Sequence, residues 1–136
     1  KTISEKEHSF EVLHKNKEVI LFQDRDILRN VIINLLSNAI KYSPPMSTIH
    51  LVTHSNDSQM FIQVKDFGIG IPEQDQKFLL EPFFRANNAL NIQGTGLGLN
   101  IVKHYLNLMG GELTFTSIEN SGSTFTATFP LEKKEE

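Results

Sequence analysis

Two asparagines stand one helical turn apart in a segment that otherwise has the pattern of a long amphipathic helix. The segment NLLSNAIKYS covers residues 34–43, and in it Asn34 and Asn38 are followed by Lys41 and Tyr42. Asparagine is a mediocre helix former because its side chain competes with the backbone for hydrogen bonds. Amide oxygens, a cation and an aromatic ring on one stripe could coordinate a hard metal ion, neutralise phosphate and cover a base. The alternative is a solvated polar stripe, as on most surface helices.

Two glycine-containing segments carry further candidate chemistry. DFGIG begins at Asp66, where an apolar strand is expected to end, and Gly68 and Gly70 follow at alternate positions. This carboxylate could accept a hydrogen bond from an exocyclic amine such as that of adenine, or it could simply close an Asx-turn. GTGLGL at 94–99 precedes an expected helix, where glycines let backbone N–H groups approach an anion. Its spacing is neither a Rossmann fingerprint nor a P-loop.

The composition excludes several classes of protein. The 136 residues are 39% hydrophobic and 21% charged, which predicts one folded domain over 1–136 rather than a disordered or membrane-spanning chain. There are no cysteines, so disulfides, thiolate metal sites and cysteine nucleophiles are excluded. A net charge of −3 does not favour nucleic acid as a partner. The first residue is Lys1 rather than Met, and we expect a piece of a longer protein.

Hydrophobic periodicity and turn residues predict the elements that must position these groups. We expect long helices from Asp24 to Ser43 and from GTGLGL to Gly110, and a short helix over 73–80 within a long polar stretch at 71–93. The first helix should bury Leu28, Val31, Ile32, Leu35 and Ala39. Strands are expected at 9–15, 18–23, 48–54, 59–65, 112–118 and 123–129. This order predicts a two-layer α/β (α+β) sandwich, with a mixed, mainly antiparallel sheet packed on one face by helices.

Four segments, taken in order, resemble the N, G1, F and G2 boxes of sensor histidine kinases. They are NLLSNAIKYSP (34–44), DFGIGI (66–71), EPFFR (81–85) and GTGLGL (94–99). The resemblance spans 24–129 and implies the Bergerat fold of the gyrase, Hsp90, histidine kinase and MutL (GHKL) superfamily. It also implies that the chain binds ATP with Mg²⁺, and that 71–93 forms an ATP lid.

The resemblance implies a role for each residue that matches a box. Asn38 matches the Mg²⁺-binding Asn, and its amide oxygen would serve as one ligand beside water and phosphate oxygens. Lys41 matches the lysine that neutralises phosphate, and Tyr42 matches the ring that packs near adenine. Asp66 matches the carboxylate that receives the adenine amino group. Arg85 matches the lid arginine that can reach the γ-phosphate when the lid closes.

Further residues of the boxes are expected to bind the nucleotide as well. The glycines of the G1 box open the purine pocket, and those of the G2 box lie at the phosphates. The full set predicted here is Gly68, Gly70, Ile71, Phe83, Gly94, Thr95, Gly96, Leu97 and Gly98. Two positions depart from the family pattern, with Leu80 where Phe is frequent and Phe84 where Tyr is frequent. Both keep apolar bulk, so we expect lid docking to be preserved.

Asn34 stands where ATP-hydrolysing relatives carry a glutamate that acts as general base for water. Most histidine kinases have Asn at this position. An amide cannot take a proton, so activation of water should be poor. Asn34, together with the phosphate-binding cations Lys41 and Arg85, therefore forms a catalytic set that favours phosphoryl transfer to a protein nucleophile over steady hydrolysis of ATP.

The histidine that would accept the phosphoryl group is not recognisable in this chain. None of its five histidines stands in the family's phosphoacceptor motif, a His followed by an acidic residue; they are His8, His14, His50, His54 and His104. The resemblance therefore implies that the dimerisation and phosphoacceptor domain belongs to another segment of the parent chain, and that the first helix of the catalytic domain is also cut off. We expect a monomeric, cytoplasmic fragment that is not inserted in a membrane, with a response regulator as an indirect partner.

The leading hypothesis is the catalytic, ATP-binding domain of a bacterial sensor histidine kinase. A nucleotide-binding regulatory module or pseudokinase is the alternative, although Arg85 and the complete glycine segment argue against it. A GHKL ATPase of the gyrase or MutL type is disfavoured by Asn34. A serine kinase acting on an anti-anti-sigma factor is disfavoured for the same reason, since those relatives generally carry an acidic residue there.

Overall fold

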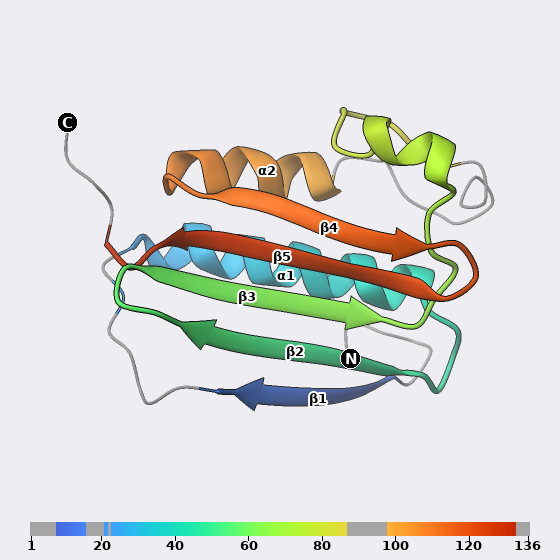
Figure 1. Cartoon of the computed structure of the whole chain (residues 1–136), viewed down its shortest axis with the longest axis horizontal. Helices are drawn as coiled ribbons and strands as arrows, with labels where there is room; N and C mark the ends of the chain where they lie inside the picture. Colours follow the sequence, from blue (N-terminus) through green and yellow to red (C-terminus); the bar gives the residue numbers. More distant parts are fainter. Residues whose placement is uncertain (1–7, 16–20, 22, 87–97, 133–136) are drawn as a thin grey trace.

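The computed structural model describes residues 8–15, 21, 23–86 and 98–132. Five strands form one sheet in the order β1-β2-β3-β5-β4 (Figure 1). The elements are β1 (Ser9–His14), α1 (Arg25–Tyr42), β2 (Thr48–Ser55), β3 (Gln59–Asp66), the 3-10 helix η1 (Glu73–Phe78), α2 (Gly98–Leu108), β4 (Glu112–Ile118) and β5 (Gly122–Pro130). The β1–β2 pair is parallel and the other three pairs are antiparallel. The predicted mixed, mainly antiparallel sheet is therefore confirmed.

The partner of β1 differs from the expected hairpin. The sequence pattern predicts a second strand over 18–23, where only Leu21 and Gln23 are described, and neither lies in a strand. β1 instead runs parallel to β2, with α1 forming the crossover between them. The side-chain amide of Gln23 donates a hydrogen bond to the Pro130 carbonyl oxygen at 2.8 Å, at the end of β5. This contact places the chain before α1 beside the end of a different strand, away from β1.

The ends of α1 follow the predicted capping chemistry. The Asp24 carboxylate accepts hydrogen bonds from the backbone N–H groups of Asp26 and Ile27, at 2.8 and 3.1 Å. These bonds satisfy two of the donors that the first helical turn leaves open. At the other end Ser43 is extended, as expected for a residue that precedes proline. The predicted helix over 24–43 is thus present with its polar stripe near its C-terminal end.

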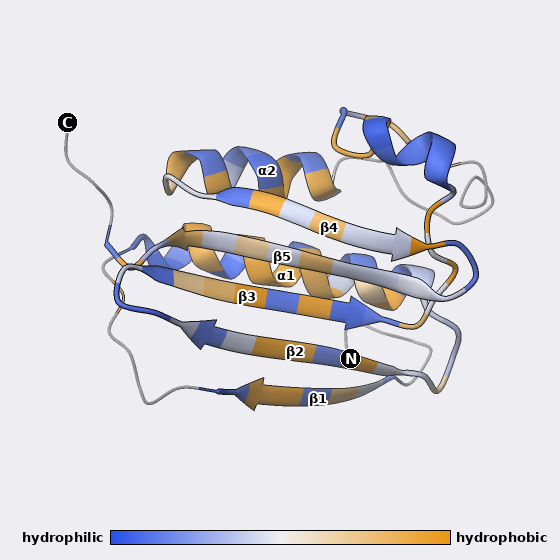
Figure 2. Cartoon of the chain, in the orientation of Figure 1, coloured by the Kyte–Doolittle hydropathy of each residue, from blue (hydrophilic) through white to orange (hydrophobic). Residues whose placement is uncertain are grey.

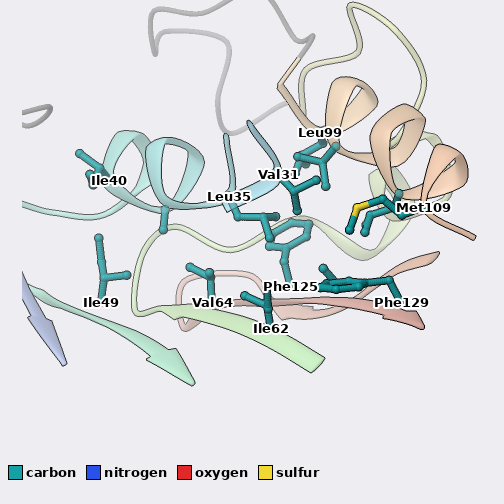
Figure 3. Close-up of a cluster of buried hydrophobic side chains, with 14 of the residues drawn as sticks. Val31, Leu35, Ile40, Ile49, Ile62, Val64, Leu99, Met109, Phe125 and Phe129 are labelled. Atoms are coloured by element: carbon teal, nitrogen blue, oxygen red, sulfur yellow. The ribbon is translucent and has the colours of Figure 1, made fainter. Parts of the chain in front are cut away.

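The hydrophobic core lies between the sheet and the two long helices, which pack on the same face (Figure 3). Hydrophobic residues recur along the strands (Figure 2), and on β3 burial alternates, with Met60, Ile62 and Val64 buried in the core. Of the predicted apolar face of α1, Val31, Leu35 and Ala39 are buried. Leu28 and Ile32 are partly buried and pack against the same core.

The segment after β3 contains the expected short helix and part of the predicted lid. The short helix expected over 73–80 is present as η1, which begins at Glu73 and ends at Phe78. The predicted lid over 71–93 is described only as far as Ala86, and 87–93 lie outside the described residues. No helix in the described part of the chain is long and apolar enough to cross a membrane.

Replacing Leu35 by Ala should destabilise the fold strongly. The Leu35 side chain is 1% exposed, so truncation leaves a cavity in the core, and we expect a loss of about 2–5 kcal/mol in the free energy of unfolding. Ile33, on the same helix, is 46% exposed, and Ile33→Ala should cost at most about 0.5 kcal/mol. Urea unfolding followed by circular dichroism measures both. Equal losses for the two variants would contradict the assignment of the buried face.

Candidate functional site

One cavity brings together most of the described residues that the sequence singled out. It lies where the C-terminal half of α1, the end of β3, the segment around η1 and the first turn of α2 meet. Its predicted members are Asn34, Asn38, Lys41, Tyr42, Asp66, Gly70, Ile71, Arg85 and Gly98. Segments far apart in the chain therefore contribute to a single site.

The wall formed by α1 carries the two asparagines. The Asn34 side-chain amide donates a hydrogen bond to the Asn30 carbonyl oxygen at 2.7 Å, which sets the orientation of the amide plane. Its oxygen then lies on the side of α2, 3.9 Å from the position that a Cβ would take at Gly98. Asn38 makes no side-chain hydrogen bond within the described part of the chain. The asparagines therefore face a cavity, and the amide of Asn38 is available to a ligand.

Two cations and a phenol ring also line this cavity. The Lys41 ammonium is 5.9 Å from the centroid of the Tyr42 ring, within cation–π distance. Burial raises the pKa of the Tyr42 phenol, and the positive charge of Arg85 partly opposes that rise. Arg85 is thus close enough to Tyr42 for its charge to act there. Tyr42 stays neutral at physiological pH and presents an apolar ring with a hydroxyl donor.

Asp66 supplies a buried carboxylate at the end of β3. The residue is 3% exposed, and its Oδ1 accepts hydrogen bonds from the backbone N–H groups of Gly68 at 2.9 Å and Ser123 at 3.3 Å. Its Oδ2 makes no hydrogen bond with the described residues. Burial raises the pKa of this carboxyl, and the two backbone hydrogen bonds partly oppose that effect. One oxygen therefore closes the Asx-turn, while the other can accept a hydrogen bond from a ligand.

The glycines after Asp66 permit close backbone contacts. A Cβ at Gly68 would lie 2.1 Å from the Tyr42 carbonyl oxygen, and the next N–H, that of Ile69, donates to the same oxygen at 3.1 Å. Gly70 has φ +66° and lies against the carbonyl of Ile118. Gly68 does not line the cavity. Its role in this structure is to let the loop that follows β3 pack on the last turn of α1.

Several predicted residues lie elsewhere. Phe83 has φ +64°, is 69% exposed and does not line the cavity, whereas its neighbour Phe84 does. The Phe84 ring lies 5.8 Å from that of Phe78 in η1, measured between centroids. The left-handed backbone at Phe83 turns successive side chains in different directions, which the box pattern alone does not reveal. The predicted nucleotide contacts at Gly94, Thr95, Gly96 and Leu97 lie outside the described residues.

Residues that the sequence pattern did not assign to the site also line the cavity. They are Ser37, Ile69, Leu79, Phe84, Ala86, Leu99, Ser123 and Phe125. Ser123 pairs with Asp66 in the register of β3 and β5, and Phe125 follows on the same face of β5. Strand alternation assigns these two side chains to one face, but which strand lies beside β3 is a tertiary fact. The mostly apolar character of the set suits a flat, hydrophobic ligand group.

A family comparison identifies the class of protein to which this cavity belongs. The model of the family described as "Histidine kinase-, DNA gyrase B-, and HSP90-like ATPase" matches residues 23–133. The chain therefore belongs to this family, and the predicted membership in the GHKL superfamily is confirmed. It is a histidine kinase-type ATPase domain by sequence and by fold.

Individual relatives are sensor kinases of greater length. The circadian input-output histidine kinase CikA of Synechococcus elongatus is 40% identical over 121 residues, which cover 87% of this chain and 16% of CikA. The sensor histidine kinase WalK of Bacillus subtilis is 38% identical over 117 residues, or 83% of this chain and 19% of WalK. The chain thus spans less than a fifth of either relative. Among solved structures, the mycobacterial sensor histidine kinase MprB superposes with a TM-score of 0.80 at 30% identity, covering 93% of this chain and 86% of that one.

Replacing Gly68 by Ala should disrupt the site through backbone overlap. The added Cβ would lie 2.1 Å from the Tyr42 carbonyl oxygen, so the loop after β3 must move away from α1. We expect a loss of about 1–3 kcal/mol in the free energy of unfolding. Gly98→Ala is the matched control, because the nearest atom to its Cβ is 3.9 Å away and alanine favours a helix. Urea unfolding of both variants tests this, and an unaffected Gly68→Ala protein would contradict the close approach.

Proposed function

We propose that this chain binds ATP with Mg²⁺ and delivers the γ-phosphoryl group to a histidine on a separate dimerisation and phosphoacceptor domain of its parent chain. One observation carries the proposal. A single cavity holds a buried carboxylate with a free oxygen, and the same cavity is lined by two amides and two cations. Such a site complements a ligand with an amine-bearing base and a polyphosphate. The family of ATPases to which the chain belongs supports the same conclusion.

The base would occupy the part of the cavity beside Asp66. Its exocyclic amine would donate to Asp66 Oδ2, since Oδ1 already accepts two backbone hydrogen bonds. Apolar side chains from the loop after β3 and from β5, including Ile71 and Phe125, would cover the faces of the ring. Because burial raises the pKa of Asp66, the carboxylate form is lost at a higher pH than for an exposed aspartate. Binding of the amine should weaken as the pH falls through that raised value.

The phosphates would lie along the α1 wall. Lys41 and Arg85 would neutralise their charge, and the N-terminal end of α2 at Gly98 favours anions through its backbone N–H groups. The described residues contain no group of three or more His, Asp or Glu side chains that could hold a metal ion. Asn38 offers one amide oxygen, so a Mg²⁺ ion held there would take its other ligands from phosphate and water, a donor set that suits this ion. When bound, it would screen the charge of the phosphates.

The chemistry of Asn34 supports transfer over hydrolysis. Its amide is held by the hydrogen bond to Asn30 and cannot accept a proton from water. A histidine from the parent chain brings its own nucleophile, an imidazole nitrogen with a lone pair. That nitrogen would form a bond to the γ-phosphorus as the bond to the β–γ bridging oxygen breaks, and ADP would leave. A response regulator would then receive the phosphoryl group from the histidine.

Asp66→Asn should weaken adenine nucleotide binding while the fold persists. The amide loses a charge-assisted hydrogen bond to the amine, worth about 1.5–3 kcal/mol, or about 10- to 150-fold in the dissociation constant. Calorimetric titration with ADP and Mg²⁺ measures the change. Asp57→Asn is the matched control, because Asp57 is exposed in the β2–β3 turn. The Asp57→Asn protein should bind ADP with the affinity of the unmodified chain. Equal affinity of the Asp66→Asn and Asp57→Asn proteins for ADP would contradict the assignment of Asp66 as the acceptor for the amine of the base.

Arg85→Ala should separate binding from transfer. ADP binding should change little, because the lid arginine is assigned to the γ-phosphate, which ADP lacks. Phosphotransfer to the histidine domain of the parent should fall about 10³-fold or more, as when a transition-state arginine is removed. Arg29→Ala, an exposed arginine of α1, should retain full transfer. The measurement is radiolabel transfer from ATP, and undiminished transfer by the Arg85→Ala protein would refute the lid assignment.

A further inference from the structure

Ser117 on β4 does not line the cavity, yet its hydroxyl contacts two segments that build it. The Ser117 Oγ accepts a hydrogen bond from the backbone N–H of Ile71 at 2.8 Å. It lies 2.7 Å from the Oγ of Ser123 and 3.2 Å from the carbonyl oxygen of Gly122, to which it can donate. The hydroxyl thereby joins the loop after β3 to the start of β5.

Gln76 in η1 also joins Ile71 to Ser117. Its side-chain amide donates hydrogen bonds to the carbonyl oxygens of Ile71 and Ser117, each at 3.1 Å. The backbone N–H and C=O of Ile71 are therefore both held by side chains, the first by Ser117 and the second by Gln76. Because Ile71 lines the cavity, these two side chains determine where one of its walls lies.

The same network reaches the carboxylate of Asp66. Ser123, whose hydroxyl contacts Ser117, donates its backbone N–H to Asp66 Oδ1 at 3.3 Å. The start of β5 also lies close to β3 there, since a Cβ at Gly122 would be 2.2 Å from the Asp66 carbonyl oxygen. A shift of the β4–β5 turn would therefore rotate the carboxylate and redirect its free oxygen.

The loop between Asp66 and Ile71 needs such external support. Gly68 and Gly70 leave its backbone with wide conformational freedom, so its own residues do not define one geometry. Backbone hydrogen bonds of Ile69 also hold this loop, since its N–H donates to the Tyr42 carbonyl oxygen and its own carbonyl oxygen accepts from the Asn120 N–H at 2.7 Å.

We infer that Ser117 and Gln76 are positioning residues that set the selectivity of the site for a base with an exocyclic amine. They act by holding Ile71 and the start of β5 so that Asp66 Oδ2 points at the amine. The inference rests on the proposed function, in which Asp66 receives that amine. Neither residue touches the nucleotide in this assignment, so their effect should appear in the discrimination between bases and not in the binding of phosphates.

Two ligands that differ only in the amine test this inference. Calorimetric titrations of the whole chain with Mg²⁺ would compare ADP with purine riboside 5′-diphosphate, which lacks the 6-amino group. Ser117→Ala removes the hydroxyl, and Gln76→Glu replaces the amide donor by an acceptor of the same shape. Each should weaken ADP binding about tenfold and change the affinity for the analogue less than twofold. Ser117→Thr, which retains the hydroxyl, should restore discrimination.

Matched controls and a second variant distinguish a loss of the positioning role from a folding defect and from a failure of the proposed function. Ser121→Ala in the β4–β5 turn and Gln74→Glu in η1 make the same chemical changes at exposed positions nearby and should leave both affinities unchanged. If Ser117→Ala does not fold in urea-unfolding controls, Gln76→Glu decides the question alone. Unchanged ADP affinity, or an equal loss for both ligands, would overturn the positioning role while leaving the proposed function intact. An unmodified chain that binds neither ligand would overturn the proposed function and this inference with it.

Discussion

The burial of the Asp66 carboxylate at the end of β3 is the constraint on which the rest of the site depends. A carboxylate removed from water is unstable unless hydrogen-bond donors replace the lost hydration. Two backbone N–H groups, those of Gly68 and Ser123, donate to one of its oxygens. They do not cancel the effect of burial, since the pKa of the group remains raised. The carboxylate therefore retains capacity for a further donor, which a ligand can supply.

Satisfying that carboxylate requires three backbones to approach one another closely. Gly68 lies against the end of α1, and Gly122 lies against the end of β3, at distances that leave no room for a Cβ. The Tyr42 carbonyl oxygen at the end of α1 accepts the N–H of Ile69, so the helix that carries Asn34 and Asn38 is joined directly to the loop after Asp66. The part of the cavity suited to a base and the part suited to phosphate are consequently held at a set spacing.

Much of this could be predicted from local sequence. The asparagine stripe, the cap at Asp24 and the G1 segment are patterns within one helix or one turn, and each lies where the pattern predicts. The partner of β1 and the orientation of Phe83 could not be predicted in this way. Strand pairing depends on which distant segments bury apolar surface together, and the Phe83 side chain depends on a left-handed backbone that a phenylalanine rarely adopts.

The sequence by itself determined the family, the two long helices, the strands other than the one expected over 18–23, and the residue types of the site, because periodicity, caps and box motifs lie within short segments of the chain. Only the tertiary structure decided that Ser123 stands beside Asp66, that Phe84 rather than Phe83 lines the cavity, and that Ser117 and Gln76 hold Ile71. These contacts join residues that are distant along the chain. Their formation depends on the register and packing of the whole sheet, which no local window contains.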